Sequence, residues 1–568
     1  MNYRAEYDRW LGCEGLTAEE RRELEAIRGD DQEIRERFYA PLSFGTAGLR
    51  GVMGAGIRRM NARVVRQATR ALGSLILAEG GEAAAAGAVV CCDCRNHSRE
   101  YAVDAARVLA AMGVHVRLFE ALRPTPELSF AIRLHGAAAG INITASHNPK
   151  EYNGYKVYWS DGAQLPPERA ETVARAMAEL DILDPVPMAP EDDPGIEIIG
   201  RETDEAFLRA ALSQSVCPEA AAKAALRIVY TPFNGAGAKL VPEALRRMGV
   251  RELLCVEEQM APDGDFPTCK NPNPEFEAGF ERALILAREK DADLIIGTDP
   301  DADRLGLMVK TGPGEYRLLT GNEVGVLFLD YLLTAKAERG TLPERPVALK
   351  SIVSSEMARA VAERHGAEME DTFTGFKFLA ERMKLHEKDG KHVIFAFEEA
   401  IGYAFGDAVR DKDAVTAALM AAEMASYHAL RGKTLPERLE ELYALLGHRE
   451  EETVSLVMPG VDGLERMGKL MERLRRTPPA SLAGERVRRV RDYLGGEARD
   501  GEGNREALPM RGADMLYFDL ADGSAFIVRP SGTEPKVKCY LQVRGASRGE
   551  CEKKRAALAA YARSLAEA

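Results

Sequence analysis

Apolar runs and helical patterns alternate along the first quarter of the chain. Three apolar runs, at 88–92, 114–119 and 140–144, predict short buried strands. Between them, apolar positions at helical spacing predict helices over 98–112, capped by Ser98, and over 126–134. Strands that alternate with helices of about 10–15 residues are typical of βαβ units. This region therefore predicts a mostly parallel sheet.

The same pattern begins again twice. A second round has predicted strands at 227–231, 253–256 and 294–296, and helices at 238–248 and 280–290. A third round has predicted strands at 347–349 and 393–395, and helices at 323–335, 355–365 and 378–385. Three rounds of one architecture predict three related mixed α/β domains, although the rounds share no evident sequence identity.

The two ends of the chain differ from these rounds. Thr17 and Glu20 form a capping box that predicts an N-terminal helix. Near the C-terminus, strands are predicted at 449–457, 516–520, 525–528 and 536–543, followed by a helix that a second capping box, Ser547 with Glu550, begins. We predict a smaller α+β C-terminal domain here, with antiparallel strands. The Pro-rich segment 183–195 suggests the first boundary, and the expected domains are 1–200, 201–317, 318–445 and 446–568.

Composition narrows the classes of function. Hydrophobic residues make up 46% of the 568 positions and charged residues 29%, the balance of a globular protein. A net charge of −13 argues against a nucleic-acid partner, which would require a basic patch. The sequence contains neither a signal-peptide pattern nor an apolar run of about 20 residues, so a cytoplasmic location without a membrane partner is expected. The cluster Cys91, Cys92 and Cys94 lacks zinc-ligand spacing and is interpreted as the end of a buried strand.

A serine follows the third predicted strand in the sequence Thr144-Ala-Ser146-His147-Asn148-Pro149. Open α/β sheets bind ligands at the carboxyl ends of their strands, where this serine would lie. His147 is adjacent and Lys156 follows across a predicted turn at 152–154, so a base and a cation are at hand. Ser146 is therefore a candidate nucleophile, with an ordinary capped polar turn as the alternative. The sequence is not the Gly-x-Ser-x-Gly elbow of hydrolases.

Three aspartates at alternate positions follow another predicted strand. The segment is Gly297-Thr-Asp299-Pro-Asp301-Ala-Asp303-Arg304. A tight loop with this spacing directs several hard oxygens at one cation, which favours Mg²⁺. An EF-hand is excluded because a strand precedes the loop and its twelfth position is Lys310 rather than Glu.

Two further loops carry polar side chains. Glu398 and Glu399 follow the strand predicted at 393–395 and could accept hydrogen bonds from sugar hydroxyls, although paired glutamates are common on surfaces. The segment 529–536, RPSGTEPK, combines a forked cation, two hydroxyls and exposed backbone N–H groups, the chemistry of a phosphate-binding nest. An ordinary Pro/Gly turn is the alternative.

Together these four loops resemble those of the α-phosphohexomutase superfamily, which contains phosphoglucomutases and phosphomannomutases. TASHNPKEYNGYK is similar to its phosphoserine loop, GTDPDADR to its metal loop, FEEAIGY to its sugar loop and RPSGTEPK to its phosphate loop. The resemblance spans 44–538, and FGTAGLRGVMGAG together with EEAIGY is most similar to the branch of bacterial phosphoglucomutases and animal phosphopentomutase-type proteins. It implies an α/β fold, three related mixed α/β domains plus a smaller α+β C-terminal domain around a central cleft.

The resemblance also implies a role for each site residue. Ser146 would carry the phosphoryl group, and Asp299, Asp301 and Asp303 would bind Mg²⁺ with the seryl phosphate as a further ligand. Arg50 and Arg304 would face the transferring phosphoryl group, Lys156 would act as a general acid or base, and Glu398 would bind sugar hydroxyls. Substrate specificity would depend on Thr374, Gly375, Phe376 and Lys377. Arg410 and Lys412 would lie near the distal phosphate, and the non-reacting phosphate would be bound by Arg529, Ser531, Gly532 and Thr533. Which residue is the general base, with His147 beside the serine, stays open.

The implied reaction is the interconversion of glucose 1-phosphate and glucose 6-phosphate. A phosphoserine gives its group to the free hydroxyl, the resulting glucose 1,6-bisphosphate reorients, and the other phosphate returns to the serine. That bisphosphate is also the expected activator, and the protein is expected to be a monomer or a small homo-oligomer. Ala400 departs from the Glu-Glu-Ser form of many phosphoglucomutases, which leaves pentose or mannose phosphates as alternative substrates.

Two other classes fit the residues less well. A haloacid-dehalogenase-type phosphatase would need Thr or Val where this chain has Asp303. A non-enzymatic sugar-phosphate sensor would need neither Ser146 nor the three aspartates.

Overall fold

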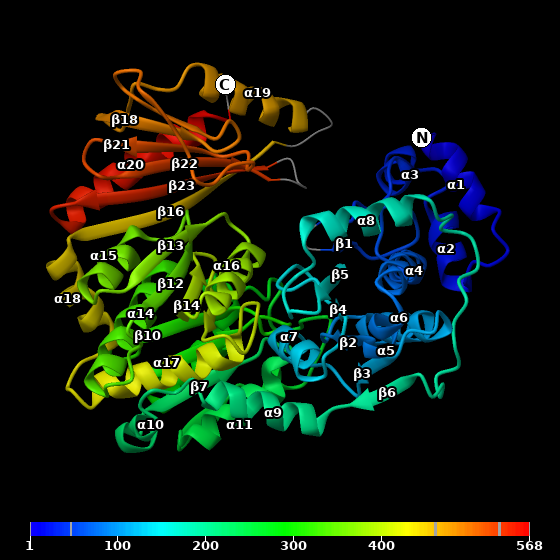
Figure 1. The fold of residues 1–568 in the computed structure, drawn as a ribbon, viewed down its shortest axis with the longest axis horizontal. Coiled ribbons are helices and arrows are strands. Elements are labelled where there is room, and N and C mark those ends of the chain that lie inside the picture. Colours follow the sequence, from blue (N-terminus) through cyan, green and yellow to red (C-terminus); the bar gives the residue numbers. More distant parts are fainter. Residues whose placement is uncertain (1, 46–47, 459–462, 532–535, 567–568) are drawn as a thin grey trace. The chain divides into compact units, whose positions relative to one another are not determined.

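A computed structural model describes residues 2–45, 48–458, 463–531 and 536–566 (Figure 1). The chain forms two compact units, 1–321 with 379–432 and 322–378 with 433–568. Each unit is described by itself below. Among the helices that these ranges contain, none combines the length and the apolar character that crossing a membrane requires.

The first apolar runs form a mixed sheet. Its strands lie in the order β1 (Leu49–Val52), β5 (Tyr152–Trp159), β4 (Ala139–Ile143), β2 (Ala88–Cys92), β3 (Val116–Phe119) and β6 (Ile196–Ile199). Strands β4, β2, β3 and β6 run parallel, whereas β5 is antiparallel to both β4 and β1. The carboxyl end of β4 and the start of β5 therefore meet at one edge of the sheet.

Helices cover both faces of this sheet. They are α4 (Ala62–Ala78), α5 (Gly81–Ala86), α6 (Ser98–Ala111), α7 (Thr125–Leu134) and α8 (Pro167–Ala178). Successive side chains of β2 alternate between two cores, because Val90 packs with residues of α4, α6 and α8 whereas Val89 packs with residues of α7. The three N-terminal helices, α1 (Tyr3–Leu11), α2 (Ala18–Ala26) and α3 (Asp31–Phe38), bury a separate cluster around Trp10 and Phe38.

The second round forms another mixed sheet in the same unit. Its strands lie in the order β11 (Glu315–Leu318), β10 (Leu305–Gly312), β9 (Leu294–Thr298), β7 (Arg227–Thr231) and β8 (Glu252–Cys255). The accompanying helices are α9 (Arg201–Leu212), α10 (Glu219–Ala224), α11 (Gly237–Met248), α12 (Glu257–Met260), the 3₁₀ turn η1 (Glu277–Phe280) and α13 (Glu281–Lys290). Strand β9 is parallel to β7 and antiparallel to β10, so the loop between β9 and β10 is a hairpin turn.

The third round contributes to both units. The first unit contains the antiparallel hairpin of β14 (His392–Glu398) and β15 (Gly402–Phe405), and helix α17 (Ala414–Ala429). The second unit contains the parallel pair β12 (Pro346–Ser351) and β13 (Glu368–Thr372), with helices α15 (Glu356–Arg364) and α18 (Leu435–Leu446). Helices α14 (Gly321–Glu338) and α16 (Phe376–Lys388) connect the two parts of the chain.

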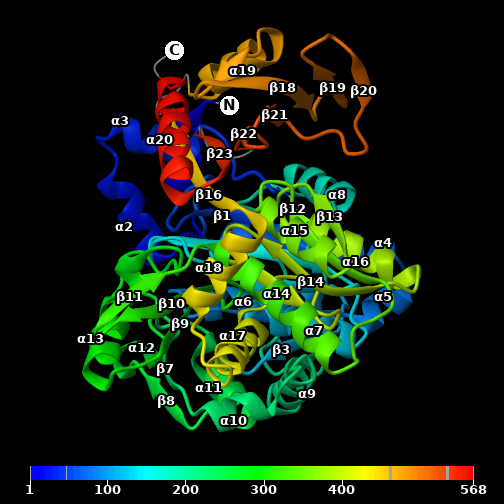
Figure 2. The same ribbon diagram turned by 90° about the vertical axis from the view of Figure 1, so that its left-hand side faces the viewer.

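The C-terminal sheet belongs to the second unit. Its strands lie in the order β16 (His448–Val457), β23 (Lys536–Gly545), β22 (Ala525–Pro530), β21 (Leu516–Leu520), β18 (Glu485–Asp492), β19 (Glu497–Asp500) and β20 (Arg505–Ala507), with β17 (Ser481–Leu482) beside β18. Neighbouring strands run antiparallel. Helices α19 (Gly463–Arg476) and α20 (Arg548–Ser564) pack on one face of the sheet, as Figure 2 shows for α20.

The α/β class and the predicted strands and helices named above are confirmed, with ends that differ by a few residues. The prediction that Ser98 caps its helix is wrong: His97 is the cap residue, and the Ser98 hydroxyl donates to Asp93 instead. The turn predicted at 152–154 is also wrong, because these residues begin β5. A Cβ atom on Gly154 would lie 2.5 Å from the carbonyl oxygen of Thr144, so the glycine marks close strand packing rather than a turn. The domain boundaries stay a prediction.

Candidate active site

Ser146 lies in the turn directly after β4 and has a backbone φ of 53°. This left-handed conformation is uncommon outside glycine and is found where surrounding contacts enforce it. One such contact is the side chain of Thr144, whose Oγ1 accepts the backbone N–H of Ser146 at 2.9 Å. The buried hydroxyl of Ser146 donates to Asp299 Oδ2 at 2.8 Å and lies 3.1 Å from His147 Nδ1. The turn therefore directs the serine hydroxyl at the aspartate loop.

The guanidinium of Arg95 holds this turn through hydrogen bonds to its backbone. It donates to the carbonyl oxygens of Ser146 at 2.7 Å, of Pro149 and Tyr152 at 2.9 Å, and of Asn148. The Arg95 side chain is fully buried, and its Nε lies 3.3 Å from Asp93 Oδ2. Asp93 in turn accepts hydrogen bonds from the hydroxyls of Thr144 and Ser98. One planar cation thus fixes four backbone positions of the serine loop.

The three aspartates lie in the hairpin turn between β9 and β10. Asp299 is the first residue after β9, and its Oδ1 accepts hydrogen bonds from the backbone N–H groups of Asp303 at 3.1 Å and Arg304 at 2.9 Å. Ala302 has a φ of 51°, which turns the chain sharply enough to bring the carboxylates together. One oxygen from each of the three aspartates lies within 4.8 Å of the others, and all three side chains are buried.

Cationic side chains surround these carboxylates. Lys156 Nζ, on β5, donates to Asp301 Oδ2 at 2.7 Å and to Asp303 Oδ2 at 3.2 Å. Lys412 Nζ lies 3.2 Å from Asp303 Oδ2 and 3.0 Å from Asp411 Oδ1. Burial by itself would lower the pKa of Lys156, but the charges of Asp301 and Asp303 raise it above its ordinary value. Lys156 is therefore protonated at neutral pH.

The same surroundings separate the titration of two aspartates. Burial, followed by the charges of Asp301 and Asp303, raises the pKa of Asp299 well above its ordinary value. Burial would also raise the pKa of Asp303, but Lys156, Lys412 and Arg304 hold it well below the ordinary range. Neighbouring carboxylates that disfavour one another's charge are a setting in which a bound cation is favourable.

The carboxylates fit a magnesium ion. Within the described part of the chain, Asp301 Oδ1 and Asp303 Oδ1 are buried and accept no hydrogen bond. A buried carboxylate oxygen without a partner is costly unless a cation or water satisfies it. Three carboxylates and a hydroxyl form an all-oxygen donor set, which suits Mg²⁺ rather than a softer metal. Asp299, Asp301, Asp303 and Ser146 would hold this ion.

The sugar loop predicted from sequence lies in the turn between β14 and β15. Glu398 is buried at the end of β14, and Ile401 has a φ of 52°. The carbonyl oxygen of Ala400 accepts a hydrogen bond from Arg304 Nη1 at 2.8 Å, and Arg304 pairs with Gly402 in a β-bridge. Arg304 therefore joins the aspartate loop to the predicted sugar loop between β14 and β15.

Three other predicted residues lie in the same unit. Arg50, on β1, donates to Asn148 Oδ1 of the serine loop at 2.9 Å. Desolvation, together with the charges of Arg304 and Arg50, holds the pKa of His147 well below its ordinary value, so its imidazole is neutral at pH 7. Arg410 pairs with Glu387, whereas its buried Nη1 has no hydrogen-bond partner in the described ranges. The structure thus brings His147 to Ser146 and Arg50 to Asn148 of the same loop, and it brings Lys412 rather than Arg410 to the aspartates.

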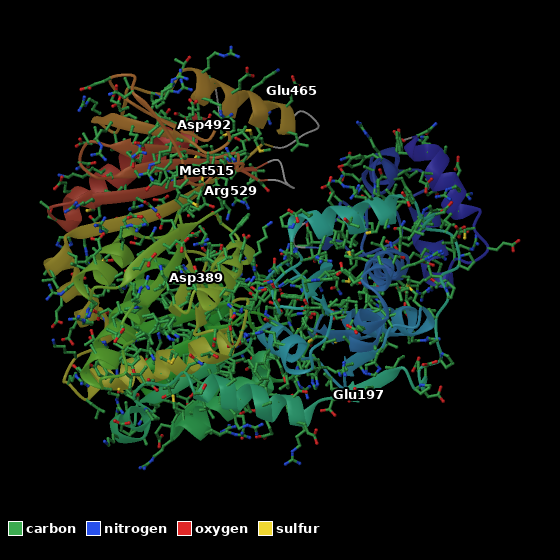
Figure 3. The ribbon with its side chains drawn as sticks, in the orientation of Figure 1. Glu197, Asp389, Glu465, Asp492, Met515 and Arg529 are labelled. Carbon is green, nitrogen blue, oxygen red and sulfur yellow. The ribbon has the colours of Figure 1, made fainter. Side chains whose placement is uncertain are left out.

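The remaining predicted residues lie in the second unit. Thr374 and Gly375 precede α16, and Lys377 Nζ lies 4.8 Å from the centre of the Phe378 ring. Burial and the positive charge of Arg529 lower the pKa of Lys377. Figure 3 labels Arg529 on β22, and Ser531 follows, its backbone N–H bonded to the carbonyl oxygen of Lys536. Gly532 and Thr533 lie outside the described residues.

Sequence reasoning missed several residues of this site. Asp411 accepts hydrogen bonds from Tyr158 and Gln164, and Thr125 donates to Asp301 Oδ2 at 2.7 Å. Arg95 was missed as well. One available signal was Arg95 beside Asp93 directly after a buried strand, the same placement that identified the aspartate loop. The long-range contacts of Thr125 and Asp411 carry no local signal.

Comparisons with known proteins identify the family of the chain. The chain matches four domains of phosphoglucomutase/phosphomannomutase: α/β/α domain I at 41–183, domain II at 205–312, domain III at 320–446 and the C-terminal domain at 480–559. A phosphoglucomutase from Staphylococcus aureus strain MRSA252 is 35% identical over 519 residues, which cover 90% of this chain and 92% of that protein.

Two solved structures share the fold. One is a phosphoglucomutase/phosphomannomutase family protein from Burkholderia thailandensis, with a TM-score of 0.65 and 19% identity over 92% of this chain and 97% of that one. The other is the open form of parafusin, a phosphoglucomutase from Paramecium, with a TM-score of 0.67 and 17% identity over 93% of this chain and 95% of that one.

Fold, aspartate loop and matched domains together define a phosphosugar mutase, an intramolecular phosphotransferase of the isomerase class. Its substrate is accordingly a phosphosugar. The chain belongs to the phosphoglucomutase/phosphomannomutase family.

Proposed function

We propose that this enzyme interconverts glucose 1-phosphate and glucose 6-phosphate, with Ser146 as the phosphoryl carrier. The strongest support comes from Ser146 itself. Its hydroxyl is buried and lies 2.8 Å from Asp299 Oδ2 in the aspartate cluster, and its backbone has the left-handed conformation. The phosphoglucomutases of Staphylococcus aureus, at 35% identity over 90% of the chain, support glucose as the sugar.

The proposed cycle has two phosphoryl transfers, one from Ser146 to the sugar and one from the sugar back to Ser146. The phosphorus–oxygen bond of phosphorylated Ser146 breaks as a free hydroxyl of the sugar monophosphate forms a new one, which gives glucose 1,6-bisphosphate. The bisphosphate reorients, and its other phosphoryl group returns to Ser146 Oγ. The same bisphosphate phosphorylates resting enzyme and so acts as the activator. A bound Mg²⁺ supplies positive charge that stabilises the transferring phosphoryl group.

Proton transfer is assigned to Lys156. Because its ammonium is protonated and donates to Asp301 and Asp303, it is placed to give a proton and to take one back. His147, neutral and 3.1 Å from Ser146 Oγ, orients the serine hydroxyl. Asp301 and Asp303 keep Lys156 in position.

The remaining roles concern substrate binding. Arg50 and Arg304 neutralise the transferring phosphoryl group, and Glu398 accepts hydrogen bonds from sugar hydroxyls. The other proposed contacts to the sugar or to its non-reacting phosphate come from Thr374, Gly375, Lys377, Arg410, Lys412, Arg529, Ser531, Gly532 and Thr533. The enzyme is also proposed to act in the cytoplasm. We propose that it is a monomer or a small homo-oligomer, and light scattering of the purified protein tests this oligomeric state.

Mass spectrometry tests the carrier. Protein treated with glucose 1,6-bisphosphate should gain one phosphate on the peptide that contains Ser146. The Ser146→Ala variant should gain none and lose mutase activity, whereas Ser74→Ala, at an exposed serine of α4, should behave as wild type. Near-normal turnover by Ser146→Ala would show that another group carries the phosphoryl.

Ala400 favours a second candidate, a broader enzyme that also accepts pentose or mannose phosphates. An alanine cannot offer the side-chain hydroxyl that serine offers to the sugar, and a site that lacks a hydrogen-bond partner discriminates less between sugars. Its carbonyl oxygen is already bonded to Arg304, so the backbone does not replace that hydroxyl. Ala400→Ser should raise the ratio of kcat/KM for glucose 1-phosphate over ribose 1-phosphate. An unchanged ratio would mean that Ala400 does not set substrate breadth.

A further inference from the structure

The C-terminal sheet carries a row of four cross-strand partners on neighbouring strands, three of which have polar side chains. Glu451 of β16 lies opposite Gln542 of β23, which lies opposite Ala525 of β22, which lies opposite Asp519 of β21. These residues share one face of the sheet, because cross-strand partners point to the same side. The opposite face bears the apolar core that packs against α19 and α20. On its own face the row lies beside a second apolar cluster, which Tyr517, Ile527 and Tyr540 form with Ile352 and Val353.

A cavity of about 350 Å³ lies over this row, and all of its lining residues belong to the second unit. This volume is within the range of small-molecule sites, roughly 300–1,000 Å³. Besides the row itself, the cavity is lined by four arginines, Arg359, Arg449, Arg488 and Arg491, and by the start of α15. Half of the residues that line the cavity are charged, which favours a polar ligand over an apolar one.

Two of these arginines already have carboxylate partners. Arg359 pairs with Asp371 and with Glu356 at 2.9 Å, and Arg491 pairs with Asp519, its Nε 2.8 Å from Asp519 Oδ2. Their charges are thereby neutralised within the protein.

The other two arginines have no such partner. Within the described ranges, no carboxylate lies at salt-bridge distance from Arg449 or Arg488, and Arg449 Nε is buried without a hydrogen-bond acceptor. The pKa of Arg449 is lowered, first by burial and only partly offset by Glu451. A buried guanidinium donor without an acceptor is a group that a bound anion would satisfy.

The carboxylates of the lining restrict which anion fits. Glu451 accepts a hydrogen bond from the Ser355 hydroxyl, and burial raises its pKa to about 7. Glu356, Asp519 and Glu451 can each accept hydrogen bonds from ligand hydroxyls, whereas they would repel an inorganic anion that has no hydroxyl groups to donate to them. The lining therefore favours a ligand that joins a phosphate group to hydroxyl groups.

We propose that this cavity binds a small phosphate monoester of a polyhydroxy compound, with Arg449 and Arg488 on the phosphate and the carboxylates on the hydroxyls. The site is separate from the phosphate loop of the same sheet. Ala525 lines the cavity and Arg529 lies four residues along β22, so the two are about 13 Å apart. A ligand here would hold the ends of β22 and β23 opposite to the ends that bear the 529–536 loop.

Calorimetric titration with glycerol 3-phosphate at low ionic strength tests the proposal. Binding should persist in Arg529→Ala, which removes a cation of the phosphate loop, and should weaken at least tenfold in Arg449→Gln. Arg486→Gln is the matched control, since it removes the same charge from an exposed position of β18 outside the cavity and should bind as wild type. Mutase turnover of Arg449→Gln without glycerol 3-phosphate should equal that of wild type, which shows that the variant is folded.

Two results would overturn the proposal. One is binding that disappears in Arg529→Ala, which would assign all phosphate affinity to the 529–536 loop. The other is equal affinity in wild type and Arg449→Gln, which would reduce the cavity to a set of internal ion pairs. If Arg449→Gln is unfolded, Arg449→Lys and Arg488→Gln replace it, and wild-type affinity in both is the contradicting result.

Discussion

Arg95 offers a sharp test of how the serine loop is held. Its guanidinium donates to four carbonyl oxygens of residues 146–152 and lies beside Asp93, all in a fully buried setting. Lysine at this position keeps the positive charge but has one nitrogen in place of a planar fork. An ammonium cannot reach carbonyls that surround the fork on two sides. The variant Arg95→Lys therefore isolates the geometry of the guanidinium from its charge.

The expected effect has two parts. A hydrogen bond to a charged group contributes about 1.5–3 kcal/mol, and leaving several carbonyls buried without a donor adds to the loss, so Arg95→Lys should lower the free energy of unfolding by about 2–4 kcal/mol. The loop would also relax around Ser146, whose φ of 53° depends on its surroundings. A displacement of about 1 Å at Ser146, the proposed phosphoryl carrier, should reduce turnover by about 100-fold, whereas substrate affinity should change little.

Chemical denaturation and steady-state kinetics measure both parts. The matched control is Arg99→Lys, on the neighbouring helix α6, because Arg99 donates to a single carbonyl, that of Phe119, and should change turnover by less than twofold. A fall in kcat with an unchanged KM would identify Arg95 as a positioning residue. Wild-type kcat in a stably folded Arg95→Lys protein would refute the reasoning, since the loop would then hold its shape without the fork.

Three further predictions concern the metal, the phosphate loop and pH. Asp301→Asn should reduce turnover by several orders of magnitude and raise the Mg²⁺ concentration for half-maximal activity, because metal charge stabilisation is worth several kcal/mol; full activity in excess chelator would contradict this. Arg529→Ala should raise KM for glucose 1-phosphate by about 10- to 100-fold, the equivalent of about 1.5–3 kcal/mol, and an unchanged KM with unchanged kcat would exclude Arg529 from phosphate binding. Burial raises the pKa of Glu451 to about 7 from 4.5, so the folded chain binds this proton more tightly than the unfolded chain and loses stability as pH rises between these values. Glu451→Gln should therefore gain up to about 3 kcal/mol relative to wild type between pH 4.5 and 8 in denaturation experiments, and a pH-independent difference would show that Glu451 titrates normally.

Local sequence patterns predicted the elements that local forces determine. The strands β2, β7 and β21 follow from apolar runs, and the capping box at Thr17 forms as expected. The aspartate loop was found because alternate carboxylates after a buried strand are unusual without a cation to bind. In each case the signal and the structure lie within a few residues of one another.

Contacts between distant segments gave no such signal. Lys412 reaches Asp303 from more than 100 positions away, and nothing near RDKD in the sequence distinguishes it from an ordinary charged turn. The Ser98 cap failed for a related reason, since Asp93 accepts the hydroxyl that was expected to cap the helix. Asn153 and Gly154 resemble a turn locally, but β1 and β4 pair on either side of β5 and keep the segment extended.

The charges of the aspartate cluster suggest why a protein of net charge −13 can handle phosphosugars. Burying an ion cluster is seldom stabilising, so this arrangement is better explained by the chemistry it serves. Four carboxylates, those of Asp299, Asp301, Asp303 and Asp411, face three cations, Lys156, Lys412 and Arg304, and the seven groups carry a formal charge of −1 when all four carboxylates are ionised, the state that a bound cation favours. These residues would repel a phosphoryl dianion by themselves, whereas with a divalent cation bound they carry +1 and attract it. We therefore expect phosphate binding here to depend on the metal, because the local charge of these residues, rather than the overall charge of the chain, decides whether a phosphoryl group is attracted or repelled.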